Sequence, residues 1–283
     1  MPPHENIWLA LAIGNSRLHW ALFCDRILQV SWDTPHLNPI AAKELMDGGL
    51  SEHPNLSPNL SSNLWQSLWQ SLSPNLWPKE ATATLLNTKV LPPLWIASVV
   101  PEQLQLWLAY PRARAIALED LPLSGLYPTL GIDRALAVLG AGTKLGWPVL
   151  VIDAGTALTF TGADRDRRLV GGAILPGLAL QLASLSRRTA ALPAIELPDR
   201  LPERWAATTP AAMSSGVIYT VLAGMRDFIA AWQDRFPASP VALTGGDSCK
   251  LKAYLQSLEP ALAEVAIADP NLIFWGIQYL AMG

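Results

Sequence analysis

Short hydrophobic runs separated by polar turns recur in two parts of the chain. The runs of the first part are residues 7–13, 17–23 and 26–32, and those of the second part are residues 148–153, 157–161 and 168–175. Alternation of apolar and polar residues with a period of two is typical of strands. Each part therefore reads as a three-stranded meander.

The two meanders follow the same plan. Residues 11–16 and 152–157 both run from a buried strand through a small glycine turn with a hydroxyl or amide side chain into a hairpin partner. This self-similarity indicates an internal duplication of a βββ unit. The later part of each half predicts further elements, and two α/β domains that face one another follow. These elements are strands at 94–99, 115–118, 241–244 and 263–267, and helices at 102–108, 211–232, 248–257 and 271–282.

The length of 283 residues also suggests about two domains. We place them at residues 1–120 and 121–283, with a low-complexity, Trp-rich insertion at about 52–79 inside the first. One helical face of the insertion would carry Trp65, Leu68, Trp69 and Leu72, and it would cover core or contact a partner. The alternative is an expanded surface loop.

Composition excludes several classes of protein. Hydrophobic residues make up 51% and charged residues 15%, so the chain is expected to fold. A net charge of −3 without a basic face argues against nucleic acid. The longest uncharged stretches, 169–186 and 205–225, are too interrupted for membrane spans, and the first residues lack a signal-peptide pattern. With only two cysteines, a reduced cytoplasmic protein is expected.

Glycine turns after buried strands are candidate phosphate sites, because backbone N–H groups there can approach an anion closely. Gly14-Asn15-Ser16 and Gly155-Thr156 fit this pattern, although hairpins use the same residues for conformational reasons alone. Asp153 ends an apolar strand, where a carboxylate needs a cation or donors, and a cation ligand is favoured over a turn cap. The equivalent position of the first half holds Ala12.

Asp133 and Arg134 precede a predicted helix that begins near residue 135. The carboxylate of Asp133 is suited to accept a hydroxyl proton, and the guanidinium of Arg134 is suited to bind a substrate carboxylate through two N–H groups. Spacing alone equally supports a structural interpretation, in which Asp133 caps the helix and Arg134 lies on the surface. The segment Thr244-Gly245-Gly246-Asp247 predicts free N–H groups at the start of a helix, with Asp247 as N-cap. The segment from Gly171-Gly172 to Pro176-Gly177 similarly marks a strand and a turn. The histidines form no cluster in sequence and receive no role: His4, His19, His36 and His53.

Taken together, these pieces resemble the type III pantothenate kinases of the acetate and sugar kinase, Hsp70 and actin superfamily. The resemblance covers nearly the whole chain apart from the insertion. The matching pieces, in family order, are Gly14-Asn15-Ser16-Arg17, Gly131-Ile132-Asp133-Arg134, Asp153-Ala154-Gly155-Thr156-Ala157, Gly171-Gly172-Ala173-Ile174-Leu175-Pro176-Gly177, Thr209 through Ser215-Gly216, and Thr244-Gly245-Gly246.

The resemblance implies an α/β fold of two duplicated ribonuclease H-like domains of βββαβα type, with a ligand cleft between them. Residues 1–120 would be an actin-like ATPase half, and residues 121–283 would carry the pantothenate and cation sites. The implied activity is ATP-dependent phosphorylation of pantothenate to 4'-phosphopantothenate, the first step of coenzyme A biosynthesis.

The resemblance also implies roles for single residues. Asp133 would be the general base, and Asp153 would bind a monovalent cation, K⁺ or NH₄⁺, while Mg²⁺ would come with ATP. Thr209 would reach pantothenate from the neighbouring subunit, so a homodimer is expected. The implied substrate-binding residues are Tyr127, Gly131, Ile132, Asp133, Arg134 and Thr209. The implied ATP-binding residues are Ala12, Ile13, Gly14, Asn15, Ser16, Arg17 and Thr156.

One position departs from the family pattern, which opens with Asp-x-Gly-Asn-Thr where this chain has Ala12-Ile13-Gly14-Asn15-Ser16. Loss of a carboxylate there weakens metal placement but leaves the backbone cradle. A non-catalytic nucleotide- or metabolite-binding regulator on the same fold is therefore an alternative to the kinase. A kinase of another small alcohol is a third reading, which should lack the 131–134 and Thr209 residues.

Overall fold

The computed structural model describes residues 6–36, 78–86 and 92–283, so the Trp-rich insertion predicted at 52–79 lies outside the described residues except for its last two positions. The chain divides into two compact units. Unit 1 comprises Met1–Leu121, Gly131–Asp133 and Ile277–Gly283, and unit 2 comprises Pro122–Leu130 and Arg134–Gly276. Among the described residues, none of the helices combines the length and apolar character needed to cross a bilayer.

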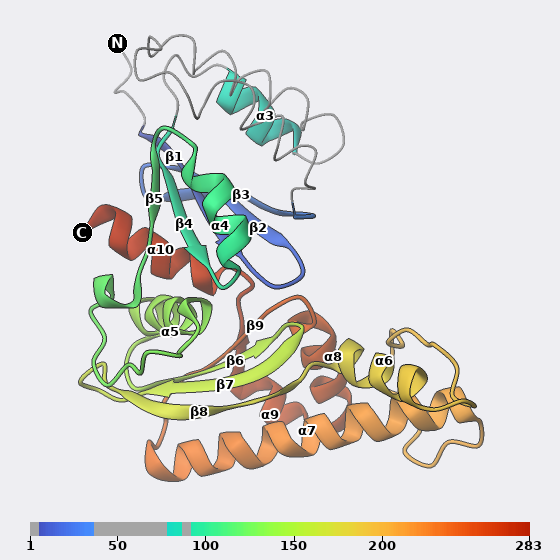
Figure 1. Cartoon of the computed structure of the whole chain (residues 1–283). Helices are drawn as coiled ribbons and strands as arrows, with labels where there is room; N and C mark the ends of the chain where they lie inside the picture. Colours follow the sequence, from blue (N-terminus) through green and yellow to red (C-terminus); the bar gives the residue numbers. More distant parts are fainter. Residues whose placement is uncertain (1–5, 37–77, 87–91) are drawn as a thin grey trace. The chain divides into compact units, whose positions relative to one another are not determined.

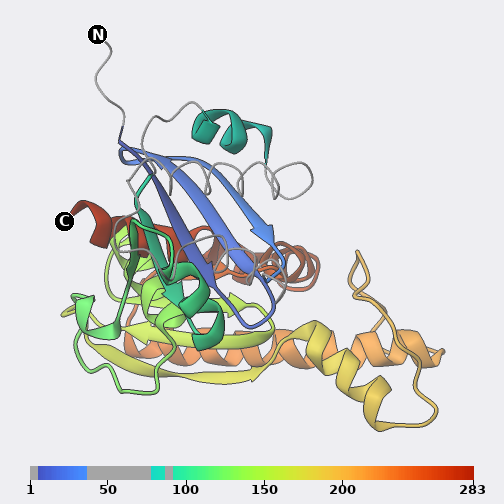
Figure 2. The same cartoon turned by 45° about the horizontal axis from the view of Figure 1, so that its top comes forward.

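Unit 1 contains a mixed five-stranded sheet in the order β3-β2-β1-β4-β5 (Figures 1 and 2). The first three strands pair antiparallel, whereas β4 and β5 are added in parallel. The elements are β1 (Ile7–Ile13), β2 (Leu18–Cys24), β3 (Ile27–Thr34), α3 (Lys79–Leu86), β4 (Leu94–Ser98), α4 (Pro101–Leu108), β5 (Ala113–Ala115) and the 3₁₀ turn η1 (Leu118–Asp120).

The position of each strand in this sheet explains its pattern of side chains. β1 lies in the centre and is buried along almost its whole length, as expected for a continuous apolar run. β3 forms the edge and alternates between exposed and partly buried residues. Trp20 on β2 packs edge-on against Trp107 of α4 in the core of this unit. The sheet of unit 1 is therefore held by a core on the side of α4.

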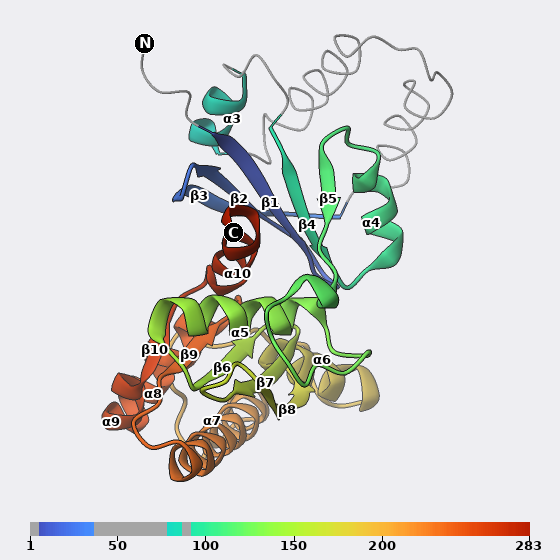
Figure 3. The same ribbon diagram turned by 90° about the vertical axis from the view of Figure 1, so that its left-hand side faces the viewer.

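Unit 2 contains a second sheet in the order β8-β7-β6-β9-β10, which repeats the order and strand directions of the first (Figures 1 and 3). The inferred duplication and the ribonuclease H-like fold of both copies are confirmed. The elements are α5 (Ile132–Leu145), which starts in unit 1, β6 (Val149–Ala154), β7 (Ala157–Ala163), β8 (Leu169–Pro176), α6 (Leu178–Arg188), α7 (Thr209–Arg235), β9 (Val241–Thr244), α8 (Ser248–Leu258), α9 (Pro260–Val265), β10 (Ala266–Ala268) and α10 (Leu272–Met282), which ends in unit 1.

Alternate residues of β6 face two different helix layers. Leu150 and Ile152 belong to a core with α7 and α8, whereas Val149 and Val151 pack with α5 and the start of α10. Figure 3 shows α5 and α7 on opposite sides of this sheet. The central strand is thus covered on both faces, which explains why it opens with an unbroken run of aliphatic residues.

Two predicted strands are wrong in part. The strand expected at 115–118 lies earlier, as β5, and residues 118–120 form a 3₁₀ turn that is closed by the Asp120 carboxylate accepting from the Ala117 N–H. The strand expected at 263–267 begins only at Ala266, because Pro260 starts the short helix α9. Helix α6, which was not predicted, follows Gly177 at its N-cap.

Candidate active site

Three of the predicted glycine segments meet at the carboxyl end of β6 in unit 2. The Gly177 N–H donates to the Thr156 carbonyl at 2.8 Å, and the Asp247 N–H donates to the Ala154 carbonyl at 2.9 Å. The turns after β6, β8 and β9 are therefore joined by backbone hydrogen bonds. Loops at the carboxyl ends of neighbouring strands are the usual place for ligands in α/β sheets.

Glycine is required at two of these positions by close backbone approach. A methyl group on Gly245 would overlap the Asp153 carboxylate and the Ala154 backbone, and Gly245 also has a φ of +89°. A methyl group on Gly177 would overlap the Gly155 carbonyl. Gly246, in contrast, has open space around its α-carbon. Close backbone contact thus requires glycine at positions 177 and 245, but not at position 246.

Asp153 lies at the centre of this junction. It is partly buried and pairs with Thr159 on β7 and Thr244 on β9. Its carboxylate lies against Gly245, beside the Ala154 carbonyl. A carboxylate beside a backbone carbonyl presents oxygen ligands, which hard cations prefer. No group of three or more His, Cys, Asp or Glu residues that could hold a metal ion is found within the described part of the chain.

Asp247 is the N-cap residue of α8, as predicted, but its side chain makes no cap hydrogen bond. Partial burial raises the pKa of the Asp247 carboxyl group, and the positive charge of Lys250 opposes this shift. The Asp247 carboxyl group lies at the start of α8, directly after the glycine turn. An anionic ligand bound at this turn would lie near the Asp247 carboxyl group.

Arg134 is buried, and three of its hydrogen bonds are to groups of unit 2. Its Nε donates to Thr161 Oγ1 at 3.0 Å, its Nη1 to the Tyr127 hydroxyl at 3.2 Å, and its Nη2 to the Phe160 carbonyl at 3.2 Å. Only 8% of the residue is exposed. The reading of Arg134 as a surface residue is wrong, and its guanidinium is oriented by the protein itself.

The pair Gly171-Gly172 is explained by this buried arginine. A methyl group on Gly172 would overlap the Phe160 carbonyl and lie 2.8 Å from Arg134 Nη2. Gly171 has a φ of +138°, which side chains rarely adopt. Strand β8 can therefore pass close to the arginine only with glycine at these positions. Tyr127, whose hydroxyl accepts from Arg134, is 41% exposed.

In unit 1, the predicted ATP-binding segment forms a tight turn. The Gly14 N–H donates to the Arg17 carbonyl at 3.0 Å, and Asn15, Ser16 and Arg17 are exposed. Ala12 and Ile13, in contrast, are buried in β1. The segment is thus divided between a core strand and an exposed turn.

Two histidines that the sequence left without a role contact this turn. His36 Nε2 donates to the Gly14 carbonyl at 2.8 Å. His19 is paired with Ala12 across β1 and β2, and its Nδ1 is 2.7 Å from the Asp33 carboxylate. This hydrogen bond is the main cause of the lowered pKa of Asp33. These pairings between neighbouring strands could have been found only by aligning the register of the meander.

Gly131, Ile132 and Asp133 also belong to unit 1. Helix α5 begins at Ile132 rather than near 135, so Asp133 lies in its first turn and is not the N-cap residue. A methyl group on Gly131 would overlap the Asp133 carboxylate and lie 3.8 Å from the Val99 side chain. The Val99 N–H in turn donates to the Ile13 carbonyl. Val99 therefore connects Gly131 with the end of β1.

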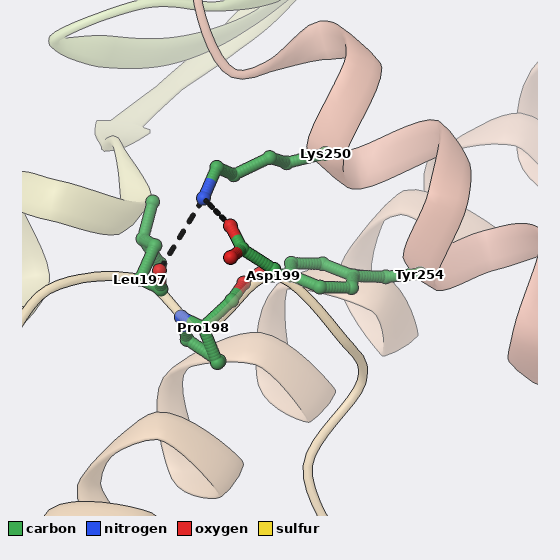
Figure 4. Close-up of polar contacts among 5 residues, drawn as sticks. All are labelled: Leu197, Pro198, Asp199, Lys250 and Tyr254. Atoms are coloured by element: carbon green, nitrogen blue, oxygen red, sulfur yellow. Dashed lines mark hydrogen bonds and ion pairs between the residues drawn. The ribbon is translucent and has the colours of Figure 1, made fainter.

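Thr209, the last predicted substrate residue, is exposed and is the first residue of α7. It follows a connection, residues 189–208, that contains neither helix nor strand. Figure 4 shows how α8 holds this connection: Lys250 Nζ donates to the Leu197 carbonyl at 3.3 Å and contacts the Asp199 carboxylate at 3.1 Å. The Tyr254 hydroxyl donates to the Pro198 carbonyl.

Comparison of the sequence with known proteins identifies one family. The sequence pattern of the type III pantothenate kinases matches residues 76–231. Proteins named type III pantothenate kinase are 49% identical in a Nostoc species, over 99% of this chain and 96% of theirs, and 42% identical in a Synechocystis species, over 98% and 91%.

Solved structures extend the likeness to the fold. A conserved protein of Campylobacter jejuni, described as a Baf family transcriptional activator, superposes with a TM-score of 0.56 at 19% identity, over 96% of both chains. A reductive activator for corrinoid, iron-sulfur protein superposes with a TM-score of 0.50 at 13% identity, over 100% of this chain and 61% of the other. At these identities the likeness shows the fold alone.

Proposed function

The chain belongs to the type III pantothenate kinase family and phosphorylates pantothenate with ATP in coenzyme A biosynthesis, and from this premise we propose that Asp133 is the general base of the reaction. The family membership decides for the kinase over the non-catalytic regulator that the sequence also allowed. The observation that carries the assignment is the position of Asp133 in the first turn of α5, next to Gly131 and close to the end of β1.

Phosphoryl transfer depends mainly on alignment and on neutralisation of charge. The base therefore contributes in a limited way, since it orients the pantothenate hydroxyl and accepts its proton as the bond to phosphorus forms. Asp133 lies in the first turn of α5, and its carboxylate oxygens are suited to accept a hydroxyl proton. Gly131 leaves room for this carboxylate.

Recognition of the pantothenate carboxylate is proposed for Arg134 and Tyr127 acting together. Arg134 supplies a positive charge whose direction is set by Thr161 and Phe160. The Tyr127 hydroxyl accepts a hydrogen bond from Arg134, which leaves its own O–H proton to donate to a substrate oxygen. The pair therefore offers both charge and a directed donor. Gly131 and Ile132 complete the proposed substrate contacts from the preceding turn.

ATP is proposed to bind the backbone turns at residues 12–17 and at Thr156. The exposed turn at Gly14–Arg17 and the turn after β6 both follow central strands. ATP brings a divalent metal, as the kinase family implies, and Mg²⁺ is held largely through phosphate oxygens and water. When bound, Mg²⁺ neutralises charge on the phosphates. The exposed turn residues Asn15, Ser16 and Arg17 fit this mode, because they would meet the nucleotide that carries the ion.

Asp153 is proposed to hold a monovalent cation, K⁺ or NH₄⁺. Its carboxylate lies beside the Ala154 carbonyl at the junction of three turns, and such an oxygen-rich set matches an ion of single charge. The cation would offset the negative charge of Asp153 at a phosphate-binding junction. Residues 121–283 carry the pantothenate and cation sites in this proposal.

Thr209 is proposed to contact pantothenate in a neighbouring subunit of a homodimer. The residue is exposed at the start of α7, and Trp205, just before it, is 89% exposed. Large exposed aromatic side chains are characteristic of protein interfaces. Mass measurement in solution tests this part, and a strict monomer contradicts it.

The assignment of the base is tested by kinetics. The protein is incubated with Mg-ATP, potassium and pantothenate, and 4'-phosphopantothenate is quantified by mass spectrometry. We expect Asp133→Asn to lower kcat by at least about 100-fold, the lower range for loss of a general base. Asp234→Asn, at an exposed position of α7, is the matched control. Near-normal turnover of Asp133→Asn rejects the assignment.

A further inference from the structure

The connection between α6 and α7, residues 189–208, is long for a segment without helix or strand, and such connections are commonly functional. It is nevertheless well anchored. Leu192, Ile195, Leu197 and Leu201 pack against the core of unit 2. The connection leads directly into Thr209, so its anchors determine where α7 begins.

Helix α7 holds the second half of this connection. The Ser215 hydroxyl donates to the Arg204 carbonyl at 2.7 Å, and the Tyr219 hydroxyl donates to the Pro202 carbonyl at 2.9 Å. The Arg204 guanidinium also stacks on the Tyr219 ring at 4.0 Å. These contacts come from the same helix that the connection enters. They hold the connection against α7, but they do not link it to another helix.

Helix α8 holds the first half through Lys250 and Tyr254, which lie one turn apart on the same face. They donate to two successive carbonyl groups, those of Leu197 and Pro198 (Figure 4). Tyr254 is only 1% exposed. Helix α8 itself begins directly after the Gly245-Gly246-Asp247 turn, whose backbone is bonded to the end of β6. An unbroken path therefore runs from the β6 junction through α8 to the connection.

We propose that Lys250 and Tyr254 are positioning residues for the pantothenate site, which set the place of Thr209 through residues 197–208. This inference rests on the proposed role of Thr209. Their donors hold backbone carbonyls, so the effect does not depend on the side chains of the connection.

The ion pair with Asp199 contributes little to this anchoring. The Asp199 side chain is 97% exposed, and ion pairs in water are weak. The bonds to the Leu197 and Pro198 carbonyls carry the effect instead. Variants that remove these bonds should therefore differ from a variant that removes only the carboxylate.

The test compares Tyr254→Phe and Lys250→Met with Asp199→Asn in the full-length protein. We expect the KM for pantothenate to rise about 5- to 10-fold in the first two, with kcat and the KM for ATP within about twofold, since only binding of one substrate is affected. Asp199→Asn should stay within about twofold. Lys252→Met is the control on α8, because Lys252 makes no polar contact within the described residues. Lys250→Arg, which keeps a cationic donor, should recover part of the loss.

Hydrogen exchange separates this inference from the proposed function. Tyr254→Phe and Lys250→Met should increase amide exchange at residues 205–212, whatever Thr209 does. A lowered melting temperature with unchanged exchange and unchanged KM for pantothenate overturns the inference and leaves the two residues as structural. If Thr209→Ala raises the KM but the α8 variants do not, the inference is also overturned. If exchange increases while Thr209→Ala leaves the KM unchanged, the proposed role of Thr209 fails.

Discussion

Ala12 and Asp153 occupy equivalent positions in the two sheets. Each is the next-to-last residue of a central strand and lies two residues before a glycine turn. Across the hairpin, Ala12 faces His19 and Asp153 faces Thr159. The duplicated fold has thus kept a carboxylate in one copy and a methyl group in the other. In the sheet with Ala12, the register across β1, β2 and β3 aligns Ala12 with His19 and His19 with Asp33. The carboxylate of Asp33 is hydrogen-bonded to His19.

Restoring a carboxylate at Ala12 should strengthen the use of Mg-ATP. Residues paired across a hairpin project from the same face, so the carboxylate of Ala12→Asp would lie on the same face as His19, near the turn at Gly14–Arg17. We expect the half-saturating Mg²⁺ concentration in the kinase assay to fall by roughly threefold or more, since a carboxylate is a hard-cation ligand. Ala12→Asn, with the same shape and no charge, should show no such fall. An unchanged Mg²⁺ dependence in Ala12→Asp contradicts the prediction.

Sequence periodicity predicted the central part of each sheet well. The strands at residues 7–13 and 241–244 coincide with β1 and β9, because buried strands leave an unbroken apolar run between polar turns. It failed at one edge of each sheet, at β5 and β10. β5 and β10 have three residues each, too few for a period of two to be seen, and their neighbours belong to short helical turns.

The candidate site was predictable only where backbone demands a particular residue. Glycine turns can be recognised in the sequence, because close approach at Gly177, and close approach with a positive φ at Gly245, exclude other residues. Burial of Arg134, on α5, could not be predicted, since its partners Thr161 and Phe160 lie on β7, 27 and 26 residues later in the chain. The contact of His36 with Gly14 likewise depends on how the meander folds back.

Two adjacent glycines in the turn after β9 should differ strongly in how much alanine destabilises the protein. At Gly245, the new methyl group would meet Asp153 and the Ala154 backbone, and the positive φ adds strain. We expect Gly245→Ala to lower the free energy of unfolding by more than about 2 kcal/mol. Gly246→Ala, with open space around it, should change it by less than about 0.5 kcal/mol. Urea denaturation of both variants checks this, and similar losses in the two would refute the close approach.

The Arg134–Tyr127 pair should behave as one unit in substrate binding. Arg134→Lys keeps the charge but cannot reach all three acceptors at once, so we expect a loss of about 1–3 kcal/mol in unfolding free energy. Tyr127→Phe removes one partly exposed contact and should cost less than about 1 kcal/mol. Both should raise the KM for pantothenate. A double-mutant cycle in KM measures the coupling, and strictly additive effects would show that the two residues act independently.

The pH dependence of stability should reveal the partly desolvated Asp247 carboxylate. Burial raises its pKa above the ordinary value of 3.8, with Lys250 working in the opposite direction. A carboxyl group whose pKa is higher in the folded than in the unfolded protein contributes stability that is fully present below the unfolded pKa. That stability is lost as the pH rises through the folded pKa. At neutral pH, the charged Asp247 therefore lowers the stability of the fold.

Asp247→Asn removes this charge and keeps a good N-cap residue, and no side-chain cap bond is lost. We therefore expect the variant to melt higher than the parent at pH 7, without nucleotide present, and the difference to shrink as the pH falls toward 4. Asp234→Asn, at an exposed site on α7, should show no such trend. Melting curves between pH 4 and pH 8 provide the measurement. A difference for Asp247→Asn that is constant over this range would mean that the carboxylate is as well solvated in the folded protein as in the unfolded chain.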